Sequence, residues 1–204
     1  MKEIRSQIKI VDNFLTPTGL EMLSKLTQKA SAEEWRIFWV LSDIVDNTGD
    51  DNDELHNSQL VHNFGEMDTM HHLEEAGVLD RLGCLYICRA KMNIGFRTKT
   101  NLTSKFHVDL CSRDYHDGLT EVDELTGVGV TTAVLYINTC NGGTMFEDGT
   151  FIKSKANRLV EFPRELKHAG VSTTDAPRRT VLNLNYIPLN YFPAYGKNRF
   201  KDGD

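Results

Sequence analysis

Short segments with strand patterning, separated by turn residues, fill the second half of the sequence. Tyr86–Ile94 and Arg179–Ile187 alternate between apolar and polar side chains, and Val130–Asn138 is apolar on both faces. Asn141-Gly142-Gly143 supplies turn residues for a hairpin into Thr144–Phe146. Shorter strands are expected at 150–153 and 157–162 and from residue 168 onward. Such a series predicts a barrel or sandwich of β-strands.

The first part of the chain adds helices to this core. Thr16 is a candidate N-cap with Pro17 at the first helical position, and the leucines that follow give this helix an apolar stripe. A second helix is expected over Asp68–Leu82, with Asp68 as its N-cap. Strands are expected at 8–14 and 35–41, and a solvated loop at 43–54. The fold class is therefore mainly β with flanking helices, that is, α+β.

Length and composition indicate one globular domain. The 204 residues are read as a single unit, with N-terminal support at 1–83, a strand core at 84–187 and a C-terminal tail at 188–204. A net charge of -6 leaves no excess of Lys and Arg, which argues against nucleic acid and anionic membranes as partners. The absence of a signal-like N-terminus and the scattered cysteines, read as reduced thiols, predict a cytoplasmic location.

The segment Phe106–Leu110 carries the first chemical signal. In a β-strand its side chains alternate, so that His107 and Asp109 share one face while the apolar residues share the other. An imidazole beside a carboxylate is two thirds of the facial triad of two histidines and one carboxylate that suits ferrous iron with open coordination positions. A third ligand is needed to complete such a site.

His168 follows Asp109 by 59 positions (168 minus 109), and Arg179 follows His168 by 11 (179 minus 168). This order resembles that of the Fe(II)- and 2-oxoglutarate-dependent dioxygenases, specifically the prolyl 4-hydroxylase-like type, with compact members in bacteria and their viruses. The resemblance runs from about Ile8 to Ile187 and leaves 95–104, 111–129 and the tail unmatched. It implies a double-stranded β-helix, or jelly-roll, core of the cupin-like kind.

The resemblance also implies roles for individual residues. His107, Asp109 and His168 would bind iron, and Arg179 would pair with the far carboxylate of 2-oxoglutarate. Arg178 is the rival for that role; Arg179 is favoured because it directly precedes the final strand and shares a face with the asparagines of that strand. A guanidinium suits the role because it matches a carboxylate bidentately and stays charged.

Two further contacts to the cosubstrate are implied. Tyr136 matches a tyrosine of the family that donates a hydrogen bond to the same carboxylate, with a core aromatic as the alternative interpretation. Asn93 lies where the strand before the His-x-Asp segment contributes a polar contact, with a strand-end cap as the alternative. The acidic stretch 111–129, beside the expected site, is interpreted as a lid loop.

The implied reaction consumes Fe(II), 2-oxoglutarate and O2, with ascorbate as a candidate reductant, and releases succinate and CO2 while a C–H bond is hydroxylated. The expected target is a prolyl or other peptidyl residue. A free amino acid, small metabolite or nucleobase is the alternative, because loops supply the substrate contacts in such folds. A jelly-roll binding module without turnover is the alternative outside the enzyme class. The sequence leaves the oligomeric state open.

Overall fold

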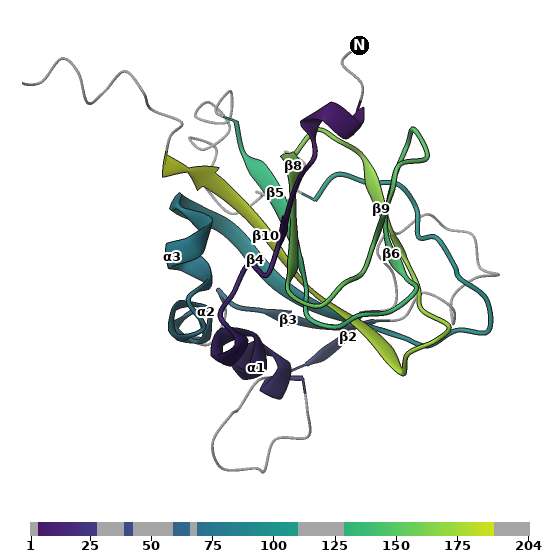
Figure 1. The fold of residues 1–204 in the computed structure, drawn as a ribbon, viewed down its shortest axis with the longest axis horizontal. Coiled ribbons are helices and arrows are strands. Elements are labelled where there is room, and N and C mark those ends of the chain that lie inside the picture. The colour runs from purple at the N-terminus through teal and green to yellow at the C-terminus, as the bar shows by residue number, and fades with distance from the viewer. Residues whose placement is uncertain (1–3, 28–38, 43–58, 66–68, 110–128, 190–204) are drawn as a thin grey trace, which may run out of the picture.

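The structure is a computed structural model that describes residues 4–27, 39–42, 59–65, 69–109 and 129–189. Strands dominate it, with helices confined to the first part of the chain (Figure 1). The elements are η1 (Ile4–Gln7), β1 (Lys9–Asp12), α1 (Pro17–Lys25), β2 (Val40–Ser42), β3 (Gln59–Asn63), α2 (His71–Glu75), α3 (Val78–Leu82), β4 (Cys84–Phe96), β5 (Thr131–Tyr136), β6 (Gly143–Phe146), β7 (Phe151–Lys153), β8 (Arg158–Pro163), β9 (His168–Val171) and β10 (Arg178–Pro188).

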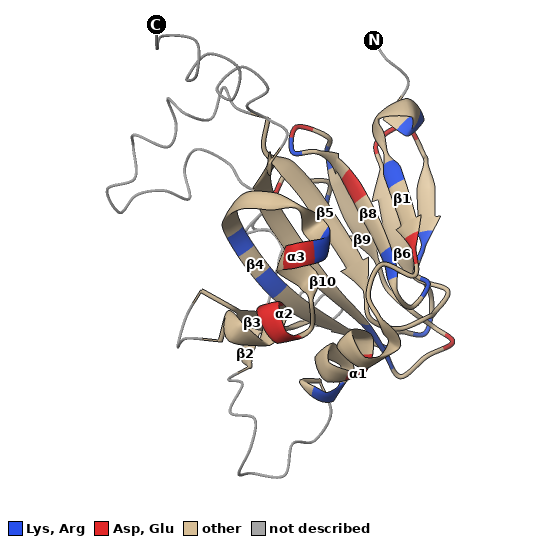
Figure 2. Ribbon diagram, turned by 60° about the vertical axis from the view of Figure 1, so that its left-hand side comes forward, with Lys and Arg blue, Asp and Glu red and all other residues tan. Residues whose placement is uncertain are grey.

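The strands form two antiparallel sheets. The large sheet has the order β1-β8-β5-β10-β4-β3-β2, and the small sheet has the order β7-β6-β9. The helices lie on one side of the large sheet and the small sheet lies on the other (Figures 1 and 2). The predicted sandwich supported by helices is therefore confirmed, and β1, β2 and β3 extend the large sheet at both of its edges.

Two apolar clusters hold these layers together. The larger one lies between the helices and the outer face of the large sheet, where Leu23 of α1 and Leu73 of α2 are fully buried with Leu182 and Leu184 of β10. The smaller one lies between the two sheets and includes Phe146 of β6. Alternation along β10 explains the division, because successive side chains point to opposite faces of the sheet.

The helix predictions are confirmed in one case and corrected in the other. The Thr16 side chain accepts a hydrogen bond from the backbone N–H of Gly19 at 3.1 Å, so α1 has the predicted N-cap. The region 68–82 contains two short helices, α2 and α3, instead of one. Gly77 separates them with a φ of +74°, a left-handed conformation that ends a helix and that glycine adopts without steric cost.

The predicted hairpin at Asn141-Gly142-Gly143 is also corrected. β6 pairs with β7 and β9, not with β5, so these residues carry the chain from the large sheet to the small one. The glycines serve close approach: a Cβ on Gly142 would lie 2.5 Å from the Val171 carbonyl oxygen. A Cβ on Gly143 would lie 2.2 Å from the carbonyl oxygen of Ile152.

Several other predictions lie wholly or partly outside the described residues. These are the N-cap at Asp68, the loop at 43–54, most of the strand at 35–41, the lid at 111–129 and most of the tail. Within the described part of the chain, no helix combines the length and the apolar character needed to cross a membrane.

Candidate metal centre

His107 and His168 face each other across the edge of the small sheet. His168 begins β9, and its backbone exchanges two hydrogen bonds of 3.0 Å with the backbone of His107. This is an isolated antiparallel bridge, so the predicted strand at 106–110 is wrong: His107 belongs to an irregular segment that meets β9 only at two isolated pairs, this one and Thr103 with Val171. The bridge nevertheless fixes the two imidazole rings with their centroids 4.9 Å apart.

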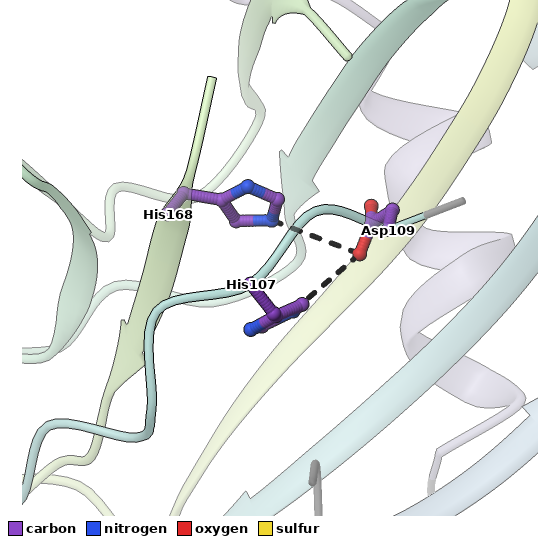
Figure 3. Close-up of side chains that lie close together, drawn as sticks. All are labelled: His107, Asp109 and His168. Carbon is purple, nitrogen blue, oxygen red and sulfur yellow. Dashed lines mark ion pairs between the residues drawn. The ribbon is translucent and has the colours of Figure 1, made fainter. Parts of the chain in front are cut away.

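Asp109 completes the group. Its Oδ1 lies 3.6 Å from Nε2 of His107 and 3.7 Å from Nε2 of His168, and the three candidate ligand atoms all lie within 4.8 Å of one another (Figure 3). These separations are longer than a direct hydrogen bond. Asp109 Oδ2 is buried without a hydrogen-bond partner. Three converging donor atoms and an unpartnered carboxylate oxygen fit a metal ion bound among them.

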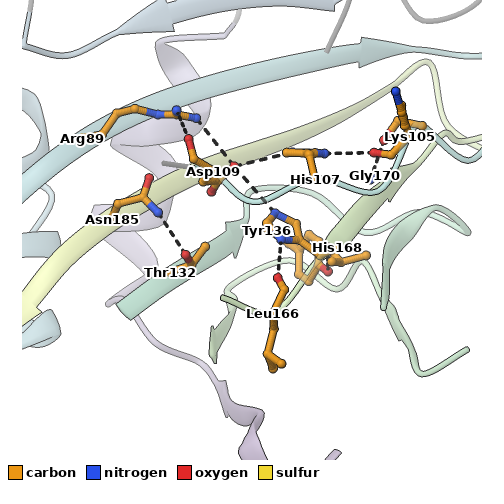
Figure 4. A network of polar contacts seen from close by, with 12 residues as sticks. Arg89, Lys105, His107, Asp109, Thr132, Tyr136, Leu166, His168, Gly170 and Asn185 are labelled. Carbon is orange, nitrogen blue, oxygen red and sulfur yellow. Dashed lines mark hydrogen bonds and ion pairs between the residues drawn. The ribbon is translucent and has the colours of Figure 1, made fainter. Parts of the chain in front are cut away.

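Both imidazoles are oriented by backbone carbonyl groups. Nδ1 of His107 lies 3.0 Å from the Lys105 carbonyl oxygen, and Nδ1 of His168 lies 3.2 Å from that of Leu166 (Figure 4). A carbonyl oxygen only accepts hydrogen bonds, so Nδ1 carries the proton in each neutral ring and Nε2 keeps its lone pair. Histidines that bind metals typically donate their other N–H in this way.

Arg89 is a part of this site that sequence reasoning missed. From β4, its Nη1 donates to the Asp109 carbonyl oxygen at 2.6 Å, and its Nη2 lies 3.6 Å from Asp109 Oδ1. Burial raises the pKa of Asp109, but the two nearby imidazoles and the charge of Arg89 outweigh it and hold the pKa well below its usual value. The one available signal was the place of Arg89 on the polar face of the alternating strand.

The two candidate arginines point in opposite directions. Arg178 donates from Nη1 to the Thr27 carbonyl oxygen at 2.8 Å, toward the end of α1. Arg179 lies between the sheets, with its Cζ 5.6 Å from the centroid of the Tyr136 ring and its Nη2 3.4 Å from Thr144 Oγ1. Its Nε is buried without a hydrogen-bond partner. Arg179 is thus the arginine on the same side of the sheet as the histidines.

Tyr136 and Asn93 lie on that same inner face. The Tyr136 hydroxyl lies 2.8 Å from Thr144 Oγ1 and 3.1 Å from the Ile152 carbonyl oxygen, and burial raises its pKa. Asn93 of β4 lies opposite Val181 of β10, and the Oδ1 of Asn93 is buried without a hydrogen-bond partner. The structure therefore brings His107, Asp109 and His168 into one cluster and puts Arg179 against Tyr136, while Asn93 shares the face without a hydrogen bond to either residue.

Unsatisfied polar atoms gather at this site. Of the nine buried side-chain nitrogen and oxygen atoms without a hydrogen-bond partner among the described residues, six belong to Asp109 and the inner face of β4 and β10. Buried polar atoms normally have partners, so a concentration of exceptions indicates a place for a ligand, a metal or water. The six residues are Arg89, Asn93, Asp109, Arg179, Asn183 and Asn185.

Comparisons with known proteins give structural neighbours only. No family model matches the chain, and no curated protein matches its sequence. A prolyl hydroxylase from Trichoplax adhaerens, solved with a peptide of hypoxia inducible factor, is similar with a TM-score of 0.55 and 14% identity, covering 91% of this chain and 85% of that one.

Two further solved structures are similar to the same degree. The non-heme α-ketoglutarate-dependent epimerase SnoN of nogalamycin biosynthesis has a TM-score of 0.56 at 13% identity, over 89% of this chain and 76% of its own. HygX from Streptomyces hygroscopicus, solved with nickel and 2-oxoglutarate, has a TM-score of 0.54 at 10% identity, over 92% and 87%. The predicted jelly-roll is confirmed: the chain has the fold of the 2-oxoglutarate-Fe(II) oxygenases.

Proposed function

We propose that the chain is an Fe(II)- and 2-oxoglutarate-dependent oxygenase that hydroxylates a C–H bond. The observation that carries the proposal is the convergence of His107, Asp109 and His168: both Nε2 atoms, which keep their lone pairs, lie within 3.7 Å of Asp109 Oδ1. Two imidazoles and one carboxylate on one side of an ion leave positions open for a cosubstrate and O2. The fold shared with such oxygenases supports the same conclusion.

In this proposal the protein residues orient the metal ligands, and the bound Fe(II) supplies the reactivity. Lys105 and Leu166 fix the two imidazoles through their carbonyl groups, and Arg89 fixes the segment that carries Asp109. When bound, Fe(II) supplies the O2 chemistry that couples decarboxylation of 2-oxoglutarate to succinate and CO2 with hydroxylation of the substrate.

We assign the far carboxylate of 2-oxoglutarate to Arg179. The Nε of Arg179 is buried and unpartnered, and the Tyr136 hydroxyl and Thr144 hydroxyl lie beside its guanidinium. A carboxylate there would receive charge-assisted hydrogen bonds that the described residues leave unmade. Asn93 is the remaining candidate contact on this face.

For the substrate we keep a prolyl or other peptidyl residue as the first candidate. The Trichoplax adhaerens neighbour was solved with a peptide, which supports this choice. A free amino acid or small metabolite is the second candidate, since the SnoN neighbour comes from nogalamycin biosynthesis. Both candidate substrates would be hydroxylated at a metal ion held by the same three ligands.

Anaerobic titration with Fe(II) and 2-oxoglutarate tests the proposal. We expect a weak visible metal-to-ligand charge-transfer band in the wild type, and its loss in His107→Ala, because one of three protein ligands is missing. Lys99→Met is a control, since Lys99 is exposed and is not one of the three candidate ligands. A wild-type protein that binds both components without the band would disprove the oxygenase assignment.

A further inference from the structure

The inner face next to the metal centre carries more positive charge than the rest of the molecule would suggest. The chain has a net charge of -6, yet β4, β5 and β10 contain Arg89, Lys91, Arg178 and Arg179 and no Asp or Glu. The two basic bands on β4 in Figure 2 are Arg89 and Lys91. Because Arg178 points to the outer side, three of these cations lie on the inner face with Asp109.

Lys91 has no evident structural purpose among the described residues. It lies two positions from Arg89 on the same face, about 7 Å along the strand. It is half-buried, and within the described part of the chain no ion pair or hydrogen bond is formed by its ammonium group. Burial, and then the charge of Arg89, lower the pKa of Lys91 by more than the charge of Asp109 raises it, so the folded chain disfavours its charged form.

The surroundings of Lys91 are polar and equally unsatisfied. Asn183 lies opposite Lys91 in the register between β4 and β10, and Asn185 lies opposite Arg89. Asn185 donates from Nδ2 to Thr132 Oγ1 at 3.0 Å, but the Oδ1 atoms of both asparagines are buried without partners. Arg89 contributes an unpartnered Nε. The group offers hydrogen-bond donors and acceptors beside a cation that forms no ion pair with the described residues.

We propose that Lys91, supported by Arg89 and Asn183, binds a carboxylate group of the substrate to be hydroxylated. The proposal rests on the function proposed above and adds a requirement: the substrate carries a carboxylate close to the carbon that reacts. The inferred subsite differs from the place assigned to 2-oxoglutarate, since Arg179 is paired with Gly95 at the other end of the same face. The carboxylate can come from a free amino acid or from an acidic side chain in a peptide.

Replacing a cation that binds a ligand and replacing a cation that stabilises the fold have different effects on the stability of the ligand-free protein. Lys91→Met removes the charge and keeps an unbranched side chain, so we expect the melting temperature of the ligand-free protein to rise by about 2–4 °C. Lys99→Met, an exposed control, should leave it unchanged. A clear fall in the melting temperature of Lys91→Met would overturn the proposal, because it would mean that the ammonium group is satisfied within the folded protein.

Succinate formation, measured with Fe(II), 2-oxoglutarate and O2, tests the ligand. The probes are free L-amino acids, proline among them, each compared with its carboxamide, and capped proline peptides that differ only by Glu or Gln. We expect the acids to stimulate succinate formation at least tenfold more than their neutral partners, this preference to vanish in Lys91→Met, and Lys91→Arg to restore part of it. The responding pair identifies the source of the carboxylate.

Equal stimulation by acids and neutral partners in the wild type would overturn the proposal, and so would an unchanged preference in Lys91→Met. Neither result bears on the oxygenase assignment, which depends on the anaerobic charge-transfer band. If the band is absent, the proposed function fails by itself. If the band is present and the preference does not depend on Lys91, only the carboxylate subsite fails.

Discussion

The two faces of the large sheet use the same strands for opposite purposes. On the outer face, Met92, Leu182 and Leu184 are fully buried against the helices. On the inner face, the neighbouring positions Lys91 and Asn183 are polar, and Asn183 keeps a buried oxygen without a partner. At these positions, the period of two along a strand places apolar residues that stabilise the fold on one face and polar residues beside the candidate site on the other.

This difference has a direct consequence for free energy. A buried apolar side chain on the outer face contributes transfer free energy and close packing, whereas an unpartnered polar atom on the inner face costs desolvation. The protein therefore keeps destabilising polar positions on the inner face beside the metal centre, in a sheet that the apolar clusters on both faces stabilise. Sites of this kind are where stability and activity oppose each other.

Neighbouring substitutions on β10 offer the strongest test of the comparison. Leu184→Ala should lower the free energy of unfolding by about 2–5 kcal/mol, because it leaves a cavity between the sheet and the helices. Asn183→Leu should leave stability within about 1 kcal/mol of the wild type or raise it, since it removes a buried amide that lacks a partner. Denaturant unfolding with a common m-value measures both.

Similar losses of unfolding free energy in Leu184→Ala and Asn183→Leu would contradict the division into a stabilising face and a binding face. Asn185→Leu provides an intermediate case. Its amide donates to Thr132, so the replacement leaves a buried hydroxyl without that donor and should cost more than Asn183→Leu.

The adjacent arginines allow the same comparison in binding. Arg179→Leu should raise the KM for 2-oxoglutarate by roughly 30-fold or more, because losing the cation that pairs with a buried carboxylate costs about 2–5 kcal/mol. Arg178→Leu should change that KM by less than about threefold, since its guanidinium contacts the Thr27 carbonyl group on the other side. Succinate formation at varied 2-oxoglutarate concentration measures both values.

The reverse order of effects would transfer the cosubstrate contact to Arg178. A loss in Arg179→Leu that appears only in kcat, with KM unchanged, would also contradict the assignment. In that case the guanidinium would act on the reacting centre and not on the far carboxylate.

Strand alternation explains how much could be predicted from sequence. The long strands and the N-cap at Thr16 depend on neighbouring residues, and the structure confirms them. The segment around His107 also alternates, yet it is irregular, because it pairs with β9 only through isolated bridges, His107 with His168 and Thr103 with Val171. The hairpin predicted at Gly142 is wrong for a similar reason: the glycines allow close approach to carbonyl groups that are distant in the sequence, and they do not form a tight turn between paired strands.

The candidate site was predictable in part. His107, Asp109, His168 and Arg179 were chosen by their order in the chain, and the fold brings the first three together. Arg89 and Lys91 could be assigned to a polar face but not to a role. Whether such a face meets water or a ligand depends on the sheet opposite it, and that sheet comes from residues more than 50 positions away (143 minus 91 is 52).

A charge cluster at the outer edge of the sheet should have the smallest effect. Asp12 of β1 accepts hydrogen bonds from Arg158 of β8 and from Lys155, and these hold its pKa well below the usual value. A carboxyl with a lowered pKa stabilises the fold above its unfolded pKa, near 3.9, and loses this contribution as the pH falls toward the folded value. Asp12→Asn should therefore melt slightly below the wild type at pH 7, and the gap should narrow below about pH 4. Melting curves across this range check the sign.

A difference in melting temperature that stays constant with pH would mean that the ionised carboxylate contributes nothing, and that this edge is held by strand pairing between β1 and β8 alone.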